Sequence, residues 1–227
     1  MKTFLKLGGI AALLHAAAYI VGIVLGVTLI FPILEANPGQ YVAFVAENPT
    51  LVYLWNLISY WGSAITLVFM ALALYHRLKA GSPILVQTAT VFGLIWAALI
   101  IGSANLMLSD GGVIAGLYAK DPTQAATLWP ALEAVENGIV SGNELVGSLW
   151  VLLISIAALR TRGFARAFNI FGVVVSCAGI LTMIPSLVQT ARMIFGPGMI
   201  VWSIWLGVVL LLESRQAQSP IQQAAFA

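Results

Sequence analysis

The sequence predicts an all-α, polytopic bundle of six transmembrane helices, and three observations lead to this prediction. Of the 227 residues, 61% are hydrophobic and only 8% are charged, whereas a soluble domain carries about 25% charged residues. The apolar residues form long runs, comparable with the ~20 residues that cross a ~30 Å hydrocarbon core. Most of the basic residues fall between these runs on one predicted side. Composition and pattern together exclude a water-soluble fold.

Six segments are long and apolar enough to cross the membrane. They are residues 7–34, 51–75, 84–108, 123–159, 167–191 and 198–213. Asp110-Gly111-Gly112 is expected to break the third helix, and Asp121-Pro122 is a helix-start signal for the fourth. Pro130 is expected to kink the fourth helix, and Gly196-Pro197-Gly198 to form a tight turn before the sixth. Residues 1–213 therefore make one predicted domain, and residues 214–227 a polar cytoplasmic tail.

The basic residues predict the orientation. Eight of the ten lie on one side of the predicted spans: Lys2, Lys6, Arg77, Lys79, Arg160, Arg162, Arg166 and Arg215. By the positive-inside rule this side is cytoplasmic, so both termini are predicted to be inside the cell. We expect a multi-pass protein of the bacterial inner membrane, with the lipid bilayer as its surroundings. No basic run is long enough to indicate nucleic-acid binding.

Polar side chains gather in the predicted outer half of the bundle. At ~1.5 Å per helical residue, Asn56, Tyr60 and Asn105 reach the same depth as Glu144 of the fourth helix. Along that helix, a four-residue and three-residue spacing places Glu133, Asn137, Ser141, Glu144 and Ser148 on one face. A polar face avoids lipid, so we expect an outward-opening pocket between the second, third and fourth helices. The predicted ligand-binding residues are Glu144, Asn137, Ser141, Asn143, Glu136, Asn56, Tyr60 and Asn105.

Glu144 is the leading candidate, because a charged side chain well inside hydrocarbon is costly and usually has a function. Its carboxyl could bind a proton or cation, or act as a catalytic acid or base. The structural alternative is a pair with Arg192, the sole outer arginine. Glu136 and Glu133 are also consistent with solvated interface acids. Tyr41 and Trp129 fall at predicted helix ends, where aromatic side chains anchor helices at the interface.

His15 is a candidate for a proton relay with Glu144, or a hydrogen-bonded core histidine. His15 and His76 lie at different depths, so a haem or metal shared between them is not expected. The single cysteine, Cys177, excludes disulfides and metal sites built from several cysteines. No phosphate-binding loop or familiar hydrolase motif is present. We expect no cofactor and no metal.

The chain resembles uncharacterised six-helix bacterial integral membrane proteins classed under domains of unknown function. The resemblance rests on the general layout and on three local motifs. These are Arg162-Gly163-Phe164-Ala165-Arg166, Gly196-Pro197-Gly198 and Ile204-Trp205-Leu206-Gly207. It covers most of the chain and implies a similar topology, without assigning an activity or any functional residue.

Three functional hypotheses follow. The first is a small inner-membrane protein that binds or transports a proton, cation or small molecule in an extracytoplasmic-facing pocket around Glu144. The second is a membrane-embedded enzyme acting on a lipophilic substrate, with Glu144 as acid or base and Asn137, Asn143 or Tyr60 orienting it. The third is an accessory subunit of a larger complex, or a homo-oligomer, whose polar layer only joins helices.

Overall fold

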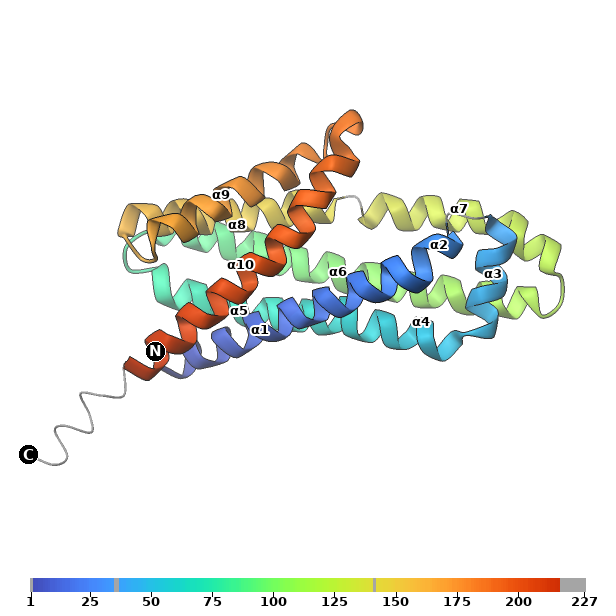
Figure 1. Cartoon of the computed structure of the whole chain (residues 1–227), viewed down its shortest axis with the longest axis horizontal. Helices are drawn as coiled ribbons and strands as arrows, with labels where there is room; N and C mark the ends of the chain where they lie inside the picture. The colour runs from blue at the N-terminus through green and yellow to red at the C-terminus, as the bar shows by residue number, and fades with distance from the viewer. Residues whose placement is uncertain (1, 35–36, 141, 217–227) are drawn as a thin grey trace, which may run out of the picture. The chain divides into compact units, whose positions relative to one another are not determined.

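The computed structural model describes residues 2–34, 37–140 and 142–216, and the regular secondary structure of these residues is entirely helical. Figure 1 shows its helices, labelled in chain order. They are α1 (Lys2–Leu25), η1 (Gly26–Ile30), α2 (Phe31–Leu34), α3 (Pro38–Glu47), α4 (Pro49–Asn56), η2 (Leu57–Gly62), α5 (Ser63–Leu78), α6 (Pro83–Tyr118), α7 (Pro122–Val140), α8 (Asn143–Thr161), α9 (Arg166–Leu181), η3 (Pro185–Leu187) and α10 (Val188–Gln216). The segments η1 and η2 are π-helical, and η3 is a 3₁₀-helix.

Within the described residues, five helical stretches are long and apolar enough to span a membrane. They are Lys2–Ile33, Pro49–Leu78, Pro83–Tyr118, Pro122–Thr161 and Pro185–Gln216, and the 16-residue α9 is a shorter apolar helix. In the most apolar part of each stretch, at most 44% of the residues are buried. Large apolar side chains such as Leu14, Ile84 and Met193 lie on the surface. An apolar surface of this extent belongs in lipid, so this is a membrane protein.

The chain forms two compact units. Unit 1 comprises residues 1–17, 65–97 and 144–227, and unit 2 comprises residues 18–64 and 98–143. The charges are divided unequally between them. Nine of the ten Lys and Arg residues belong to unit 1, and six of the eight Asp and Glu residues belong to unit 2. Unit 2 is therefore strongly acidic, with Lys120 as its one basic side chain.

Unit 1 is organised around buried tryptophans. Trp96 of α6, Trp150 of α8 and Trp202 of α10 are each at most 1% exposed. The Trp96 and Trp150 ring centroids are 5.9 Å apart, and those of Trp150 and Trp202 are 5.4 Å apart. Gly147 and Gly93 face these rings, and a Cβ would lie 2.7 Å from Trp96 at the first and 2.9 Å from Trp150 at the second. The close approach of α6 and α8 therefore depends on glycine at both positions.

Unit 2 contains a second core, in which α3 packs against α6 and α7. Its buried members are Val42, Ile114, Ala125 and Trp129. The helix α3 lies in a segment that the sequence prediction left as an outer loop. It begins where the Asn37 side chain accepts a hydrogen bond of 2.9 Å from the Gln40 backbone N–H. This N-cap, followed by proline in the first turn, favours a helix, and burial of Val42 stabilises it.

The predicted break at Asp110-Gly111-Gly112 is wrong, because α6 continues through it to Tyr118. Each glycine costs about 1 kcal/mol in a helix. Burial of Ile114 in the core of unit 2, one turn beyond Asp110, offsets that cost. The predicted start of the next helix is confirmed, since the Gln124 N–H donates to the Asp121 carboxylate at 3.0 Å.

Two further turns lie where the sequence analysis did not expect them. Gly196-Pro197-Gly198 is inside α10, and the chain reverses instead between α9 and α10, where Ile184 is extended before Pro185. Helical backbone angles are unfavourable for the residue before a proline, because it clashes with the proline ring. This explains why the chain turns at Ile184. The predicted fourth helix is interrupted between α7 and α8, at a turn that includes Gly142. Pro130 is accommodated within α7.

Candidate functional site

The most unusual polar group in unit 2 is a buried pair of carboxyl side chains. Asp110 on α6 is 8% exposed and Glu136 on α7 is 7% exposed. Their carboxyl groups lie close to each other. Two ionised carboxylates can only accept hydrogen bonds, so a hydrogen bond between them requires one proton. The Oδ2 atom of Asp110 is buried and has no hydrogen-bond partner among the described residues.

Tyr41 on α3 completes this cluster. Its ring packs on Trp129 of α7, with the ring centroids 4.4 Å apart. Burial raises the pKa of the Tyr41 phenol above its ordinary value, and the negative charge of Glu136, the nearby Tyr60 and the charge of Glu133 raise it further. The phenol therefore stays protonated at any physiological pH. It is a neutral hydroxyl that can donate a hydrogen bond beside the carboxyl pair.

No basic side chain balances the carboxyl pair within unit 2. Lys120, the single base of this unit, lies at the exposed turn between α6 and α7 and forms none of the ion pairs in the part of the chain that the structure describes. Glu133 adds a further negative charge near Glu136. A buried carboxyl without a cationic partner favours its neutral form. The arrangement can therefore hold a proton, or exchange it for a small cation.

Glu144 is an ion-paired residue of unit 1. It lies in the first turn of α8, where a negative charge is stabilised by the helix dipole. One of its carboxylate oxygens accepts a hydrogen bond of 2.9 Å from the Arg192 Nε of α10. The Glu144 side chain is 16% exposed and that of Arg192 is 38% exposed. The structure thus forms the pair that was the structural alternative for Glu144. The second oxygen, Oε2, has no hydrogen-bond partner among the described residues.

The remaining predicted site residues are dispersed. Asn56 is buried and its side-chain amide donates to the Val52 carbonyl at 3.0 Å. The Asn143 amide donates to the Ser103 hydroxyl at 3.4 Å. Tyr60 is half-buried in η2 and lies near Tyr41. Ser141 lies outside the described residues.

The prediction that the polar face of the fourth helix points into the bundle is wrong for the part that forms α7. Asn137 is exposed there, whereas the buried face consists of Ala125, Trp129 and Glu136. Asn105 of α6 is exposed too, so it does not join a buried polar layer. The interpretation of Glu136 as a solvated acid is also wrong. Packing of α3 on α7 selects this face, because it buries the large Trp129 side chain.

His15 belongs to unit 1 and is 1% exposed. Its Nδ1 lies 3.4 Å from the Thr66 hydroxyl, and its ring meets Trp96 edge-on at 6.3 Å. These contacts describe a core histidine. No group of three or more His, Cys, Asp or Glu side chains in the described ranges is arranged to hold a metal ion.

A family model described as a domain of unknown function, DUF4386, matches residues 7–213. The chain belongs to this family. The match confirms the resemblance to uncharacterised proteins of the domain-of-unknown-function type. No curated protein and no solved structure shows a significant match to the chain.

Sequence reasoning about this DUF4386 chain missed two residues of the carboxyl cluster. Asp110 was assigned to a helix break because Asp-Gly-Gly is a strong local turn signal. Tyr41 was assigned to the membrane interface because it follows an apolar run. The sequence did contain one signal for this cluster. Six of the eight acidic residues fall within residues 18–64 and 98–143, where Lys120 is the single basic residue.

Proposed function

We propose that the chain crosses the bacterial inner membrane six times, with both termini in the cytoplasm. The five long helical stretches supply five crossings, and α9 with the following turn supplies the sixth. At ~1.5 Å per residue, a 16-residue helix is about 24 Å long, close to the thickness of the hydrocarbon core. The positions of eight of the ten basic residues favour this orientation. In this topology the acidic connections of unit 2 face the outside.

The proposed function is binding of a proton, in exchange for a small cation, at the carboxyl pair of Asp110 and Glu136. The observation that carries the proposal is the burial of two contacting carboxyl groups in a unit that has one base against six acids. Acidic residues within membrane segments commonly serve proton or cation binding. The acidic surroundings also raise the local concentration of cations.

The chemistry follows from the charge balance of the site. With one proton, the pair carries a single negative charge and an internal hydrogen bond, which limits the cost of burial. A cation entering beside Oδ2 of Asp110, the oxygen without a partner, would favour loss of that proton. Tyr41 would keep its own proton and orient the Glu136 carboxyl through its hydroxyl. Binding of a cation and release of a proton are therefore coupled.

Proton release on cation addition tests this function. The full-length protein in lipid nanodiscs, in weak buffer at pH 7, would be titrated with Na⁺, K⁺ or Ca²⁺ while a pH-sensitive dye is monitored. We expect close to one proton released per chain with the preferred cation. Asp110→Asn and Glu136→Gln should both abolish release. Glu133→Gln removes a neighbouring charge without removing the pair, so it should retain release.

The same experiment separates this function from the other two hypotheses. An accessory subunit whose polar groups only join helices would release no proton with any of the cations. An enzyme that uses Glu144 would be affected by Glu144→Gln and unaffected by changes at Asp110. Either result would refute the proposed function. For Glu144 we propose a structural role, as the ion-pair partner of Arg192. The proposed binding site is therefore the pair of Asp110 and Glu136, in place of the pocket first expected around Glu144.

A further inference from the structure

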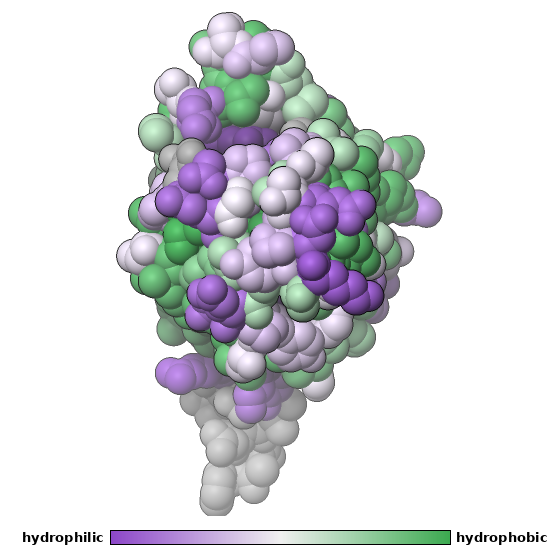
Figure 2. Space-filling view, turned by 90° about the vertical axis from the view of Figure 1, so that its right-hand side faces the viewer, coloured by the Kyte–Doolittle hydropathy of each residue, from purple (hydrophilic) through white to green (hydrophobic). Residues whose placement is uncertain are grey.

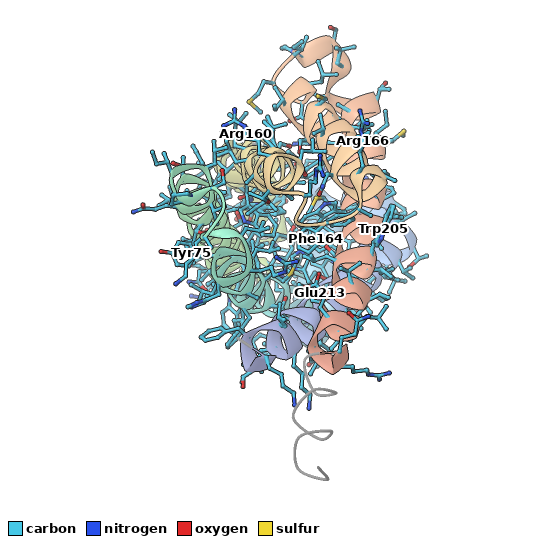
Figure 3. All side chains as sticks on the ribbon, turned by 90° about the vertical axis from the view of Figure 1, so that its left-hand side faces the viewer. Tyr75, Arg160, Phe164, Arg166, Trp205 and Glu213 are labelled. Atoms are coloured by element: carbon cyan, nitrogen blue, oxygen red, sulfur yellow. The ribbon has the colours of Figure 1, made fainter. Side chains whose placement is uncertain are left out.

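A cleft of about 460 Å³ lies in unit 1, where α8 ends and α9 begins. This volume is within the range of small-molecule sites, about 300 to 1,000 Å³. Its lining residues come from both helices and the turn between them: Ala158, Leu159, Arg162, Phe164, Arg166 and Asn169. Figure 3 shows this end of the unit, with Arg160 and Arg166 on either side of the turn that carries Phe164. The cleft contains two arginines and no carboxylate.

The N-terminus of α9 lies at this cleft, and no side-chain hydrogen bond caps it. Its N-cap residue, Ala165, has no side chain that can accept the first backbone N–H groups, and the first turn contains no acid. Arg166 occupies the first helical position instead. A positively charged side chain at the positive end of a helix dipole is repelled by that dipole. An anion bound there would be attracted by both the side chain and the dipole. The local charges are therefore those of an anion site.

The turn that carries the arginines is held in a fixed conformation. Arg162 has φ of 53°, a left-handed conformation that is unfavourable for a residue with a side chain. Beside it, Arg77 of α5 donates to the Gly163 carbonyl at 3.1 Å and to Glu213 of α10 at 2.8 Å. The Arg77 guanidinium also lies 5.6 Å from the centre of the Phe164 ring. The charge of Glu213 is thus already neutralised by Arg77.

A buried amide supplies an independent sign of a ligand. Asn169 lines the cleft and is 1% exposed. Its Nδ2 donates to the Phe164 carbonyl at 3.2 Å, and its Oδ1 is a buried acceptor that has no hydrogen-bond partner among the described residues. A buried acceptor without a hydrogen bond is costly, so it favours a ligand that can donate one. The missing ligand should combine an anion with a hydroxyl or ammonium donor.

We propose that this cleft binds the headgroup of a glycerophospholipid. The phosphate would lie at the N-terminus of α9 between Arg162 and Arg166, and the hydroxyl or ammonium group beyond it would donate to Asn169 Oδ1. Arginines on the cytoplasmic side of a membrane protein lie at the level of the lipid phosphates, which supplies the ligand at high local concentration. This site is separate from the carboxyl pair and does not depend on the function proposed for that pair.

Lipid binding to the full-length protein tests the proposal. The purified protein would be exchanged into phosphatidylcholine nanodiscs with increasing phosphatidylglycerol, and bound lipid measured by native mass spectrometry. Arg162→Gly, which also relieves the left-handed strain, and Arg166→Gln should each weaken phosphatidylglycerol binding at least tenfold, because each removes a charge-assisted hydrogen bond. Arg160→Gln removes the same charge outside the cleft. It should weaken binding by at most about fivefold, the effect of general attraction to an anionic surface.

The outcomes separate a built site from its alternatives. Equal losses in all three variants would mean general surface attraction and would overturn the proposal. Tighter binding of inorganic phosphate or glycerol phosphate than of the lipid would identify a soluble phosphate as the ligand and overturn it too. Phosphatidylmethanol has the same charge as phosphatidylglycerol but no hydroxyl donor. We expect it to bind about fivefold more weakly, and equal binding would refute the role assigned to Asn169.

Discussion

Replacing Arg192 by methionine should destabilise unit 1, because it leaves the Glu144 carboxylate without its cation. A fully exposed ion pair contributes ~0–1 kcal/mol, and breaking a fully buried pair costs ~3–5 kcal/mol. The Glu144 and Arg192 side chains are 16% and 38% exposed, at a separation of 2.9 Å. Since more than a third of the arginine is in contact with solvent, the buried value must be discounted. We expect a loss of about 1–2 kcal/mol.

A double-mutant cycle measures this coupling. The variants are Arg192→Met, Glu144→Gln and the double replacement, and the free energy of unfolding would be determined in detergent micelles by denaturant titration. Glu144→Gln removes the buried charge, so the double variant should recover most of the loss caused by Arg192→Met. The expected coupling energy is about 1 kcal/mol. Additive effects would show that the ion pair does not stabilise the fold. A larger loss in Glu144→Gln than in Arg192→Met would contradict the structural role and return Glu144 to the list of functional residues.

Two further predictions concern packing and ionisation. Gly179→Ala should cost about 1–3 kcal/mol of stability in the same unfolding assay, because a Cβ there would overlap the Ser148 hydroxyl and lie 2.6 Å from the Phe195 ring. Gly196→Ala is the control and should have little effect, because a Cβ at that position would meet nothing within 4 Å. Tyr41 should not form tyrosinate near pH 10, where an ordinary tyrosine ionises, so wild type and Tyr41→Phe should give equal tyrosinate absorbance up to about pH 11. The raised pKa means that the folded state binds the proton more tightly than the unfolded state. The stabilising contribution of the neutral phenol is therefore complete below pH ~10 and is lost as the pH rises further. A smaller absorbance in Tyr41→Phe would show that Tyr41 ionises normally.

The membrane class and the general course of the helices could be predicted from the sequence, because long apolar runs leave few alternatives in lipid. The breaks could not be placed as well. Asp110-Gly111-Gly112 and Gly196-Pro197-Gly198 are strong turn signals in water, yet both lie inside helices. Within a membrane, backbone groups must be hydrogen-bonded internally, and neighbouring helices compensate for glycine and proline. Local signals therefore predict turns less reliably here.

The candidate site was only partly predictable for the same reason. The depth of Glu144 was estimated by counting along one continuous helix, whereas the chain is interrupted at a turn beside Gly142. This interruption places Glu144 in the first turn of α8, within reach of Arg192. The contact between Asp110 and Glu136 joins residues from two helices. Only the tertiary packing of α6 and α7 brings these carboxyls together.

The distribution of polar surface is consistent with a site in unit 2. Figure 2 looks onto the side where α3 and the α6–α7 turn lie, and strongly hydrophilic residues form separate patches there among residues of intermediate hydropathy. Unit 2 also has exposed acidic residues, among them Glu47 and Asp121. Such a surface would attract cations towards the unit that holds the buried carboxyl pair.

Infrared spectroscopy of the carboxyl groups tests the central claim most directly. In nanodiscs at pH 7, a protonated carboxyl gives a C=O stretching band that an ionised carboxylate lacks. We expect this band in wild type and in Glu133→Gln, and its loss in both Asp110→Asn and Glu136→Gln, because the amide that replaces one carboxyl can donate a hydrogen bond to the other and favours its ionised form. Absence of the band from wild type, or its persistence in both variants, would show that Asp110 and Glu136 do not hold a proton between them.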